Sequence, residues 1–217
     1  MSKNFYNNYW EKGKKRITLG HANKTPKWPL KELKIFYNAI EKYIGKNILD
    51  IGAGEGIFIK YLREKNKEIN KIVALEISNV AIQRGKKRNP NIDFVESSAE
   101  ETYPFTNNEF DTLFMTDVIE HLVDIEKTIS ECNRVLKRGG NFVIITPVFN
   151  LLKKLIIATF FWDKFFYPNN PHIRFFTKNT LDSVMREHGF ERVFYQWGLT
   201  WFGIMPQNAY FVYKKTK

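Results

Sequence analysis

Cysteine is nearly absent from this 217-residue chain, and Cys132 is its single example. One cysteine excludes an intrachain disulfide and a cysteine-based zinc site. Cys132 also falls in the apolar stripe of an expected helix, which predicts a core residue and not a nucleophile. We therefore expect a reducing compartment, the cytoplasm.

Long apolar runs are missing too. The amino terminus has Asn, Tyr and Trp where a secretory signal would need a continuous apolar segment, so no signal peptide is expected. The most apolar stretch, residues 148–167, is interrupted by Lys153, Lys154, Asp163 and Lys164. It falls short of the ~20 apolar residues that span a bilayer, so we predict no transmembrane segment.

The chain also has no internal repeat, low-complexity tract or interdomain linker. Its 43% hydrophobic and 16% aromatic residues are typical of a folded chain and not of a disordered one. We predict a single domain over residues 1–217.

Positive charge is abundant but unevenly placed. The formal net charge is +11, and residues 1–34 hold nine Lys or Arg against two Glu, which is +7 of that total. This basic amino-terminal arm, residues 1–28, could attract nucleic acid, an anionic membrane or a phosphorylated substrate. We favour the simpler interpretation of a solvated basic surface, with nucleic acid as the less favoured partner.

The most informative stretch is residues 47–76, which reads as strand, glycine turn, helix and strand. The turn Gly52-Ala53-Gly54-Glu55-Gly56 follows a buried strand, and the second strand ends at Glu76. A dinucleotide fingerprint would place its third glycine at position 57, which is Ile57, and a P-loop would need Gly-Lys-Ser/Thr. Both classes of phosphate-binding turn are excluded.

The pattern Asp50-x-Gly52-x-Gly54-x-Gly56, with Glu76 closing the next strand, closely resembles motif I of the class I S-adenosylmethionine-dependent methyltransferases. The residues agree with it, because Glu76 could accept hydrogen bonds from ribose hydroxyls and Asp50 could face the cationic end of the ligand. The resemblance implies S-adenosylmethionine as cofactor and S-adenosylhomocysteine as product. It implies an α/β, Rossmann-like three-layer sandwich whose seven-stranded, mostly parallel sheet has one antiparallel edge strand and the order 3-2-1-4-5-7-6.

In the family, the region before the first helix is often a cap that closes over cofactor and substrate, so the resemblance implies such a cap for residues 1–28. Two later segments extend the resemblance. Residues 97–105 are similar to the adenine-contacting loop of the family, although Ser98 stands where an acid is usual. Residues 118–124 look like the motif after the fourth strand of quinone-biosynthesis-type methyltransferases. The cofactor-binding residues that the resemblance implies are Asp50, Gly52, Ala53, Gly54, Gly56, Glu76, Ile77, Ala99, Glu100 and Asp117.

Two histidines are the candidate catalytic residues. His121 follows a strand end on the cofactor side, and an unperturbed pKa of about 6.5 suits a general base at neutral pH. His172 is the second candidate, and either one could instead be a structural histidine. Asp117, Glu120 and His121 share one helical face, and some quinone-pathway enzymes link such a motif to Mg²⁺. A structural role for Glu120, buried against a backbone amide, is favoured here, and no metal is predicted.

The remaining pattern predicts helices over residues 29–44, 79–88, 124–137 and 178–188 and strands over residues 92–95, 109–115, 141–146, 191–197 and 208–214. Residues 137–140 read as the basic last turn and glycine stop of a helix. The last two strands are expected to form an antiparallel hairpin at the sheet edge. Residues 148–171 read as a hydrophobic insertion that lines the acceptor pocket, with a membrane-surface helix and a dimer contact as alternatives.

We therefore expect a methyltransferase that acts on an oxygen, or as second choice a nitrogen, of a small and partly hydrophobic acceptor. Two alternatives stay open: an RNA or protein methyltransferase that docks through the basic arm, and a non-catalytic module that binds S-adenosylmethionine. A peripheral membrane contact is possible, and the protein is expected to be a monomer or a homodimer.

Overall fold

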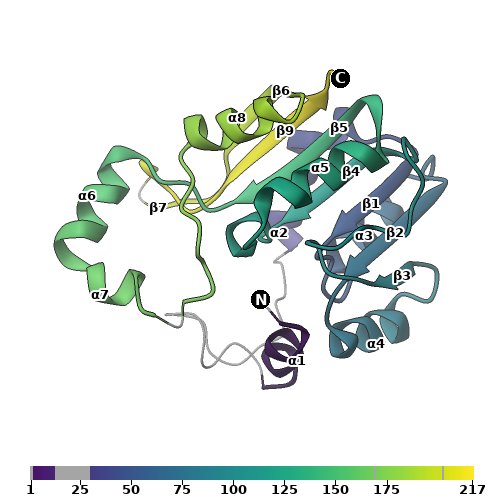
Figure 1. The fold of residues 1–217 in the computed structure, drawn as a ribbon, viewed down its shortest axis with the longest axis horizontal. Helices are drawn as coiled ribbons and strands as arrows, with labels where there is room; N and C mark the ends of the chain where they lie inside the picture. Colours follow the sequence, from purple (N-terminus) through teal and green to yellow (C-terminus); the bar gives the residue numbers. More distant parts are fainter. Residues whose placement is uncertain (1, 13–29, 169, 202) are drawn as a thin grey trace.

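The computed structural model describes residues 2–12, 30–168, 170–201 and 203–217. A seven-stranded sheet with the order β3-β2-β1-β4-β5-β9-β6 runs through the molecule (Figure 1). Its strands are β1 Asn47–Ile51, β2 Lys71–Glu76, β3 Asp93–Glu96, β4 Phe110–Thr116, β5 Leu136–Thr146, β6 Phe190–Trp197 and β9 Ala209–Lys215. Because β9 is the seventh strand of this sheet, the order is the predicted 3-2-1-4-5-7-6.

The first five strands run parallel, and β9 runs antiparallel to both β5 and β6. The antiparallel strand is therefore one place in from the edge, and β6 forms the edge. The predicted pairing of the last two strands as an antiparallel hairpin is confirmed. The connection between them contains a small second sheet, β7 Thr200–Trp201 with β8 Met205–Pro206.

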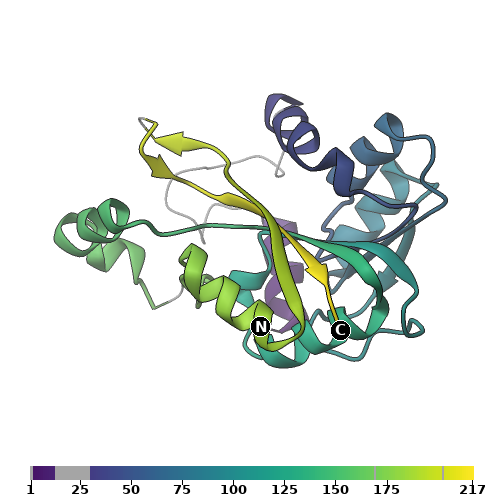
Figure 2. The same ribbon diagram turned by 90° about the horizontal axis from the view of Figure 1, so that it is seen from above.

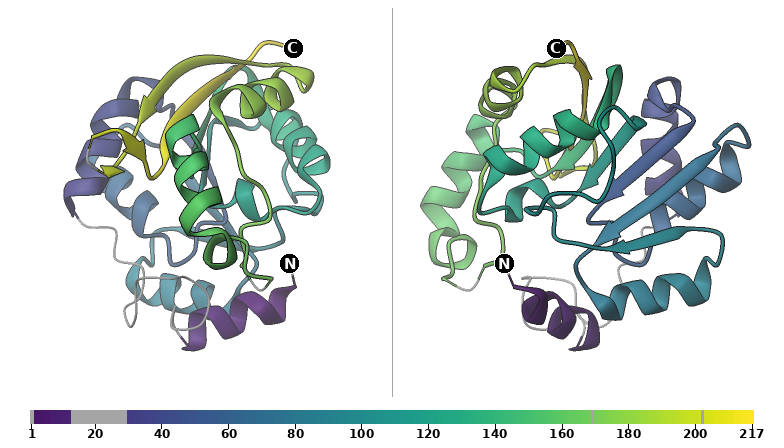
Figure 3. Two further views of the ribbon diagram at one scale, coloured as in Figure 1. Left: turned by 90° about the vertical axis from the view of Figure 1, so that its left-hand side faces the viewer. Right: turned by 45° about the vertical axis from the view of Figure 1, so that its right-hand side comes forward.

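Helices cover both faces of the large sheet, as the two halves of Figure 3 show. One core contains α2 Leu30–Ile40 and α3 Ile57–Lys65, and the other contains α5 Ile125–Val135 and α8 Lys178–Glu187. Successive residues of β4 enter opposite cores: Leu113 and Met115 face one and Phe114 faces the other. This burial on both faces explains the near-continuous apolar strands.

The described part of the chain has six further helical segments. They are α1 Lys3–Lys12, the 3₁₀ turns η2 Glu41–Tyr43 and η3 Ile119–His121, α4 Asn79–Arg88, α6 Leu151–Phe160 and α7 Trp162–Phe165. Two predicted helix starts have the expected caps. Asp124 accepts a hydrogen bond from the Lys127 amide at 3.0 Å, and Thr177 forms a capping box with Thr180.

The prediction for residues 137–140 was wrong. They belong to β5, which begins at Leu136, and α5 ends at Val135. Leu136 pairs with Phe110 whereas Asn141 pairs with Thr112, so extra residues bulge out of the strand. Gly139 allows this with a φ of +74°. The glycine pair reads like a helix stop, but it lies in a bulge between two paired stretches of one strand.

The apolar insertion forms α6 and α7, which lie together at one end of the molecule, away from β1 to β3 (Figures 1 and 2). Lys153 anchors α6: its buried ammonium donates to the carbonyls of Val148 and Pro206 at 2.9 Å each. Burial lowers the pKa of Lys153 to about 8. Among the described helices, none is long and apolar enough to cross a membrane.

Candidate functional site

A cavity of about 410 Å³ lies at the carboxyl ends of β1, β2 and β4. Open α/β sheets bind ligands at this edge, because the loops there diverge on both sides of the sheet. The structure brings all of the predicted site residues to the cavity wall except Gly56. Those eleven are Asp50, Gly52, Ala53, Gly54, Glu76, Ile77, Ala99, Glu100, Asp117, His121 and His172.

The glycine turn is bare where it meets the cavity. Gly52, Gly54 and Gly56 all have positive φ, at 72°, 56° and 73°. A Cβ on Gly54 would lie 2.8 Å from the Trp10 ring, and one on Gly52 would lie 2.3 Å from Val118. Gly56 instead precedes α3 as its left-handed N-cap. The first two glycines therefore keep space open, whereas Gly56 sets the direction of the helix.

Glu76 closes the turn from the end of β2. Its Oε2 accepts a hydrogen bond from the Gly54 amide and its Oε1 one from the Ser78 amide, both at 2.8 Å. Burial raises the pKa of Glu76, and these amide bonds act in the opposite direction. Each carboxylate oxygen has a second lone pair, so Glu76 can hold the turn and still accept bonds from ligand hydroxyls.

Asp50, at the end of β1, is also buried, with 3% of its surface exposed. Burial and the nearby charge of Glu76 raise the pKa of Asp50 well above its ordinary value. Two buried acids side by side repel each other, and a cationic ligand would relieve that repulsion.

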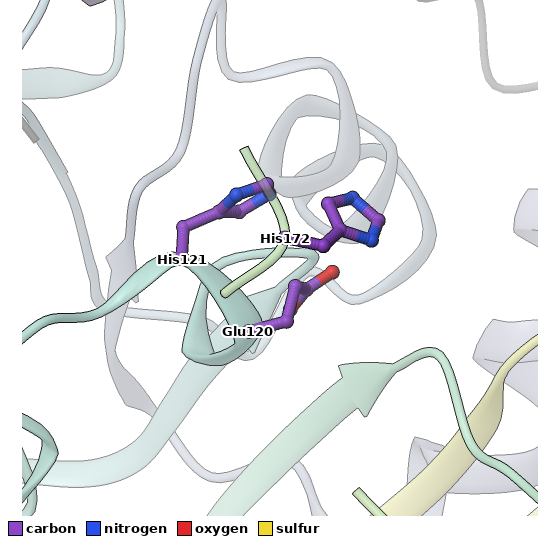
Figure 4. Close-up of side chains that lie close together, drawn as sticks. All are labelled: Glu120, His121 and His172. Atoms are coloured by element: carbon purple, nitrogen blue, oxygen red, sulfur yellow. The ribbon is translucent and has the colours of Figure 1, made fainter. Parts of the chain in front are cut away.

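The two candidate histidines meet although 51 positions separate them in the chain. The ring centroids of His121, in η3, and His172 lie 4.7 Å apart with the rings edge to face (Figure 4). His121 Nδ1 lies 2.8 Å from the carbonyl oxygen of Pro171. A carbonyl can only accept, so Nδ1 carries the proton and Nε2 keeps the lone pair. Burial lowers the pKa of His121, and the Pro171 bond opposes this.

Glu120 lies close to the two imidazoles (Figure 4) and is 1% exposed. Its Oε2 accepts a hydrogen bond from the Thr146 hydroxyl at 3.1 Å, whereas its Oε1 has no hydrogen-bond partner among the described residues. The side chain is thus buried, as expected, and its polar neighbours are the Thr146 hydroxyl and the backbone amide of Glu120 itself. Burial, with a smaller contribution from Asp117, raises the pKa of Glu120 well above its ordinary value.

Residues 49–144 match the family described as "Methyltransferase domain". This stretch is a methyltransferase domain. Solved structures agree at the level of fold: a possible histamine N-methyltransferase from Thermotoga maritima superposes with a TM-score of 0.66 at 22% identity, over 86% of this chain and 89% of that one. The cofactor of this class is S-adenosylmethionine.

Curated relatives match about half of the chain. A demethylmenaquinone methyltransferase of Paenarthrobacter aurescens is 31% identical over 111 residues, 51% of this chain and 42% of the relative. The ubiquinone/menaquinone biosynthesis C-methyltransferase UbiE of Rickettsia prowazekii is 32% identical over 127 residues, 54% of this chain and 50% of the relative. The chain therefore spans about half the length of these relatives.

The cavity of the methyltransferase domain fits this cofactor in charge and shape. S-adenosylmethionine has a cationic sulfonium and amino group, a ribose diol and no phosphate. Asp50 and Glu76 supply carboxylates for those groups, and the open glycine turn supplies close backbone contact. No Lys or Arg is among the described residues that line the cavity, so the wall does not suit a phosphate.

Helix α1 adds wall residues that sequence reasoning did not assign. Tyr6, Tyr9 and Trp10 line the cavity of the methyltransferase domain. Burial raises the pKa of Tyr9 to about 12, with a smaller contribution from Asp117. The signal in the sequence is the i, i+3, i+4 spacing of these rings, which puts them on one helical face. The rest of the predicted cap, residues 13–28, lies outside the described residues.

Contacts with α4 hold α1 in place. Arg84 donates to the Trp10 carbonyl at 2.8 Å, and the Ser78 hydroxyl donates to Asn7 at 2.9 Å. Lys3 forms an ion pair with Glu96 at the end of β3. The described part of the basic arm therefore reaches the cavity as an aromatic helix.

Glu100 has a second task beside any contact with the adenine ring. Its Oε1 accepts hydrogen bonds from the amides of Val123 and Asp124, at 2.6 Å each. These bonds tie the loop after β3 to the start of α5. Asp117, opposite, has a φ of +52°, and its amide donates to the Ile145 carbonyl at 2.9 Å. Such strained backbone concentrates at binding sites.

The segment that carries His172 is fixed to η3. The amides of Ile173 and Arg174 both donate to the Glu120 carbonyl, at 3.0 and 3.1 Å. The Arg174 guanidinium also donates to the Leu122 carbonyl at 2.7 Å. Of the insertion, residues 148–171, only Pro171 is among the described residues of the cavity wall. Its proposed contribution to an acceptor pocket stays a prediction.

Proposed function

We propose that this chain transfers the methyl group of S-adenosylmethionine to an oxygen of a small, partly hydrophobic molecule, with nitrogen as the second choice. The observation that supports an oxygen acceptor is the pair of imidazoles on the wall of the cofactor cavity. An acceptor hydroxyl must lose its proton as the new bond to carbon forms, and a neutral imidazole accepts that proton.

The chemistry asks little else of the protein. The sulfonium is already activated, so the chain must align the acceptor oxygen with the methyl carbon and sulfur and exclude water. Asp50, Glu76 and the glycine turn would hold the cofactor, and Tyr6, Tyr9 and Trp10 would cover it. We propose His121 as the first candidate for the proton acceptor, through its Nε2 atom, and His172 as the second.

Carbon is a third candidate acceptor, because one relative is named a C-methyltransferase. The partly hydrophobic nature of the acceptor is supported by the exposed apolar side chains of α6 and α7. Phe160 is 74% exposed and Trp162 57%, beside the segment that leads to His172. We propose that this surface makes a peripheral membrane contact from which a hydrophobic acceptor reaches the cavity.

The direct test is formation of S-adenosylhomocysteine with a panel of phenols, quinols, alcohols and amines, with each product identified by mass spectrometry. His121→Ala should lower the turnover number strongly and leave the affinity for S-adenosylhomocysteine within about twofold. His188→Ala is the matched control, because His188 bonds the Val184 carbonyl and pairs with Glu126, outside the cavity wall. Wild-type turnover in His121→Ala would remove His121 as the base.

The same assays address the alternatives. Salt-dependent retention of RNA that is lost on deletion of residues 1–28 would support the RNA methyltransferase. Calorimetric binding of S-adenosylmethionine without transfer to any acceptor would support a non-catalytic module. Cytoplasmic location and a monomeric or homodimeric state stay predictions.

A further inference from the structure

Three side chains in the cavity wall converge on one point. Glu120, His121 and His172 each offer one ligand atom, and these atoms lie within 4.8 Å of one another (Figure 4). Two of the atoms are imidazole nitrogens and one is a carboxylate oxygen. In the described part of the chain this is the group of His, Cys, Asp and Glu side chains that could hold a metal ion.

The carboxylate has an unsatisfied atom. Glu120 Oε1 is buried without a hydrogen-bond partner among the described residues, while Oε2 accepts from the Thr146 hydroxyl. Buried polar atoms in folded proteins are mostly paired, so Glu120 Oε1, next to two imidazoles, is an atom that an ion in the cluster would satisfy.

The outer bonds of the cluster also match a metal site. His121 donates from Nδ1 to the Pro171 carbonyl, which fixes the ring and turns Nε2 toward the other two side chains. Thr146 orients the carboxylate in the same way. Histidine and carboxylate ligands of metal ions are held by such bonds to backbone carbonyls and side chains.

We propose that Glu120, His121 and His172 bind one divalent first-row transition-metal ion, such as Mn²⁺, Co²⁺ or Zn²⁺. Two imidazoles favour these ions over Mg²⁺ and Ca²⁺, which prefer oxygen ligands. The site differs from the trio that sequence spacing suggested, because His172 takes the place of Asp117. Ligands about 2.1 Å from a tetrahedral ion are roughly 3.4 Å apart, so ligand atoms that now lie up to 4.8 Å apart approach one another by at most about 1.4 Å on binding.

Three protein ligands leave the ion at least one open position on the cavity side. An acceptor oxygen bound there is positioned and polarised, and its pKa falls. This role rests on the proposed function, whereas binding of the ion rests on the three side chains alone. With the ion bound, His121 and His172 act as ligands, the ion lowers the pKa of the acceptor hydroxyl, and the proton of that hydroxyl passes to solvent water.

The test is titration of the metal-free, full-length protein with Co²⁺ alone, followed by the visible absorption of the bound ion and by calorimetry. We expect one Co²⁺ per chain, displaced by Zn²⁺ and unaffected by a large excess of Mg²⁺. His172→Ala should weaken binding at least about tenfold, since even loss of an outer-shell partner has that effect. Thr146→Val, which keeps the shape of a buried side chain, should weaken it to a smaller extent.

His188→Ala should bind Co²⁺ as the wild type does, because this histidine lies outside the cluster. Absence of a stoichiometric Co²⁺ site in the wild type, or equal binding by folded His172→Ala, overturns the proposal. Binding of S-adenosylhomocysteine is measured on the same samples. Loss of cofactor binding with an intact Co²⁺ site would count against the proposed function alone, and the reverse result would count against the metal site alone.

Discussion

Replacement of Gly54 by valine tests the cofactor pocket most directly. Gly54 has a φ of +56°, and a Cβ there would meet the Trp10 ring at 2.8 Å. A left-handed conformation costs a residue with a Cβ roughly 1–2 kcal/mol, and more for a branched side chain. The side chain would also fill the space between the turn and α1, where the cofactor has to approach the backbone.

The backbone cost can be separated from the pocket effect. Gly139 has a φ of +74° in the bulge of β5, and a Cβ there meets nothing within 4 Å. Gly139→Ala and Gly54→Ala therefore share the conformational cost of about 1 kcal/mol, but only the second intrudes on the cavity. Both should lower the midpoint of thermal unfolding by a few degrees.

Calorimetry with S-adenosylhomocysteine gives the decisive comparison. We expect wild-type affinity for Gly139→Ala, at least about tenfold weaker binding for Gly54→Ala, and no measurable binding for a folded Gly54→Val. A tenfold change corresponds to about 1.4 kcal/mol, the size of one lost close contact. If Gly54→Val binds the ligand as tightly as the wild type does, the cofactor does not lie on this turn and the proposed pocket is wrong.

Three further predictions concern other parts of the site. Because the pKa of Glu76 is raised, its stabilising effect on the free protein is present below its ordinary pKa and is lost as pH rises through the raised value. Cofactor affinity should rise over the same pH range. Glu76→Gln should flatten the pH dependence of affinity, measured by titration calorimetry, and that of stability, measured by thermal unfolding. Arg174→Ala should destabilise the fold by about 1–3 kcal/mol and lower turnover while cofactor affinity changes little, because the bonds of Arg174 to two carbonyls hold the segment that carries His172. Arg186→Ala is the control at an exposed position, and equal turnover in both variants would contradict the role of Arg174. Phe160→Ser should reduce co-sedimentation with anionic vesicles, and Leu30→Ser, at an equally exposed position on α2, should not; a shift from dimer to monomer in Phe160→Ser would point to a homodimer contact instead.

The glycine turn and Glu76 could be predicted because their determinants are local. The spacing of three glycines dictates the backbone, and parallel strand pairing then brings the end of β2 beside the end of β1. Strand order followed from the resemblance, not from periodicity. The bulge at residues 137–140 could not be predicted, because two basic residues followed by two glycines are compatible both with the end of a helix and with a bulge in a strand.

The composition of the wall was harder to predict because it depends on tertiary packing. His121 and His172 were each identified as candidates, but their contact depends on the bonds from residues 173 and 174 to the Glu120 carbonyl. Trp10 reaches Gly54 because contacts such as the one from Arg84 hold α1 against α4. Neither contact is encoded in a local pattern.

The charges of the cavity, like its shape, favour S-adenosylmethionine as the ligand. Asp50, Glu76 and Glu120 are all buried there with raised pKa values, in a chain whose net charge is +11. Burial of an ionised carboxyl without a nearby cation is unfavourable, so these three groups, when ionised, lower the stability of the protein without its cofactor. A ligand that carries positive charge offsets this cost, and a neutral one does not. S-adenosylmethionine is cationic at sulfur and S-adenosylhomocysteine is not, so the same acids that favour the substrate favour release of the product.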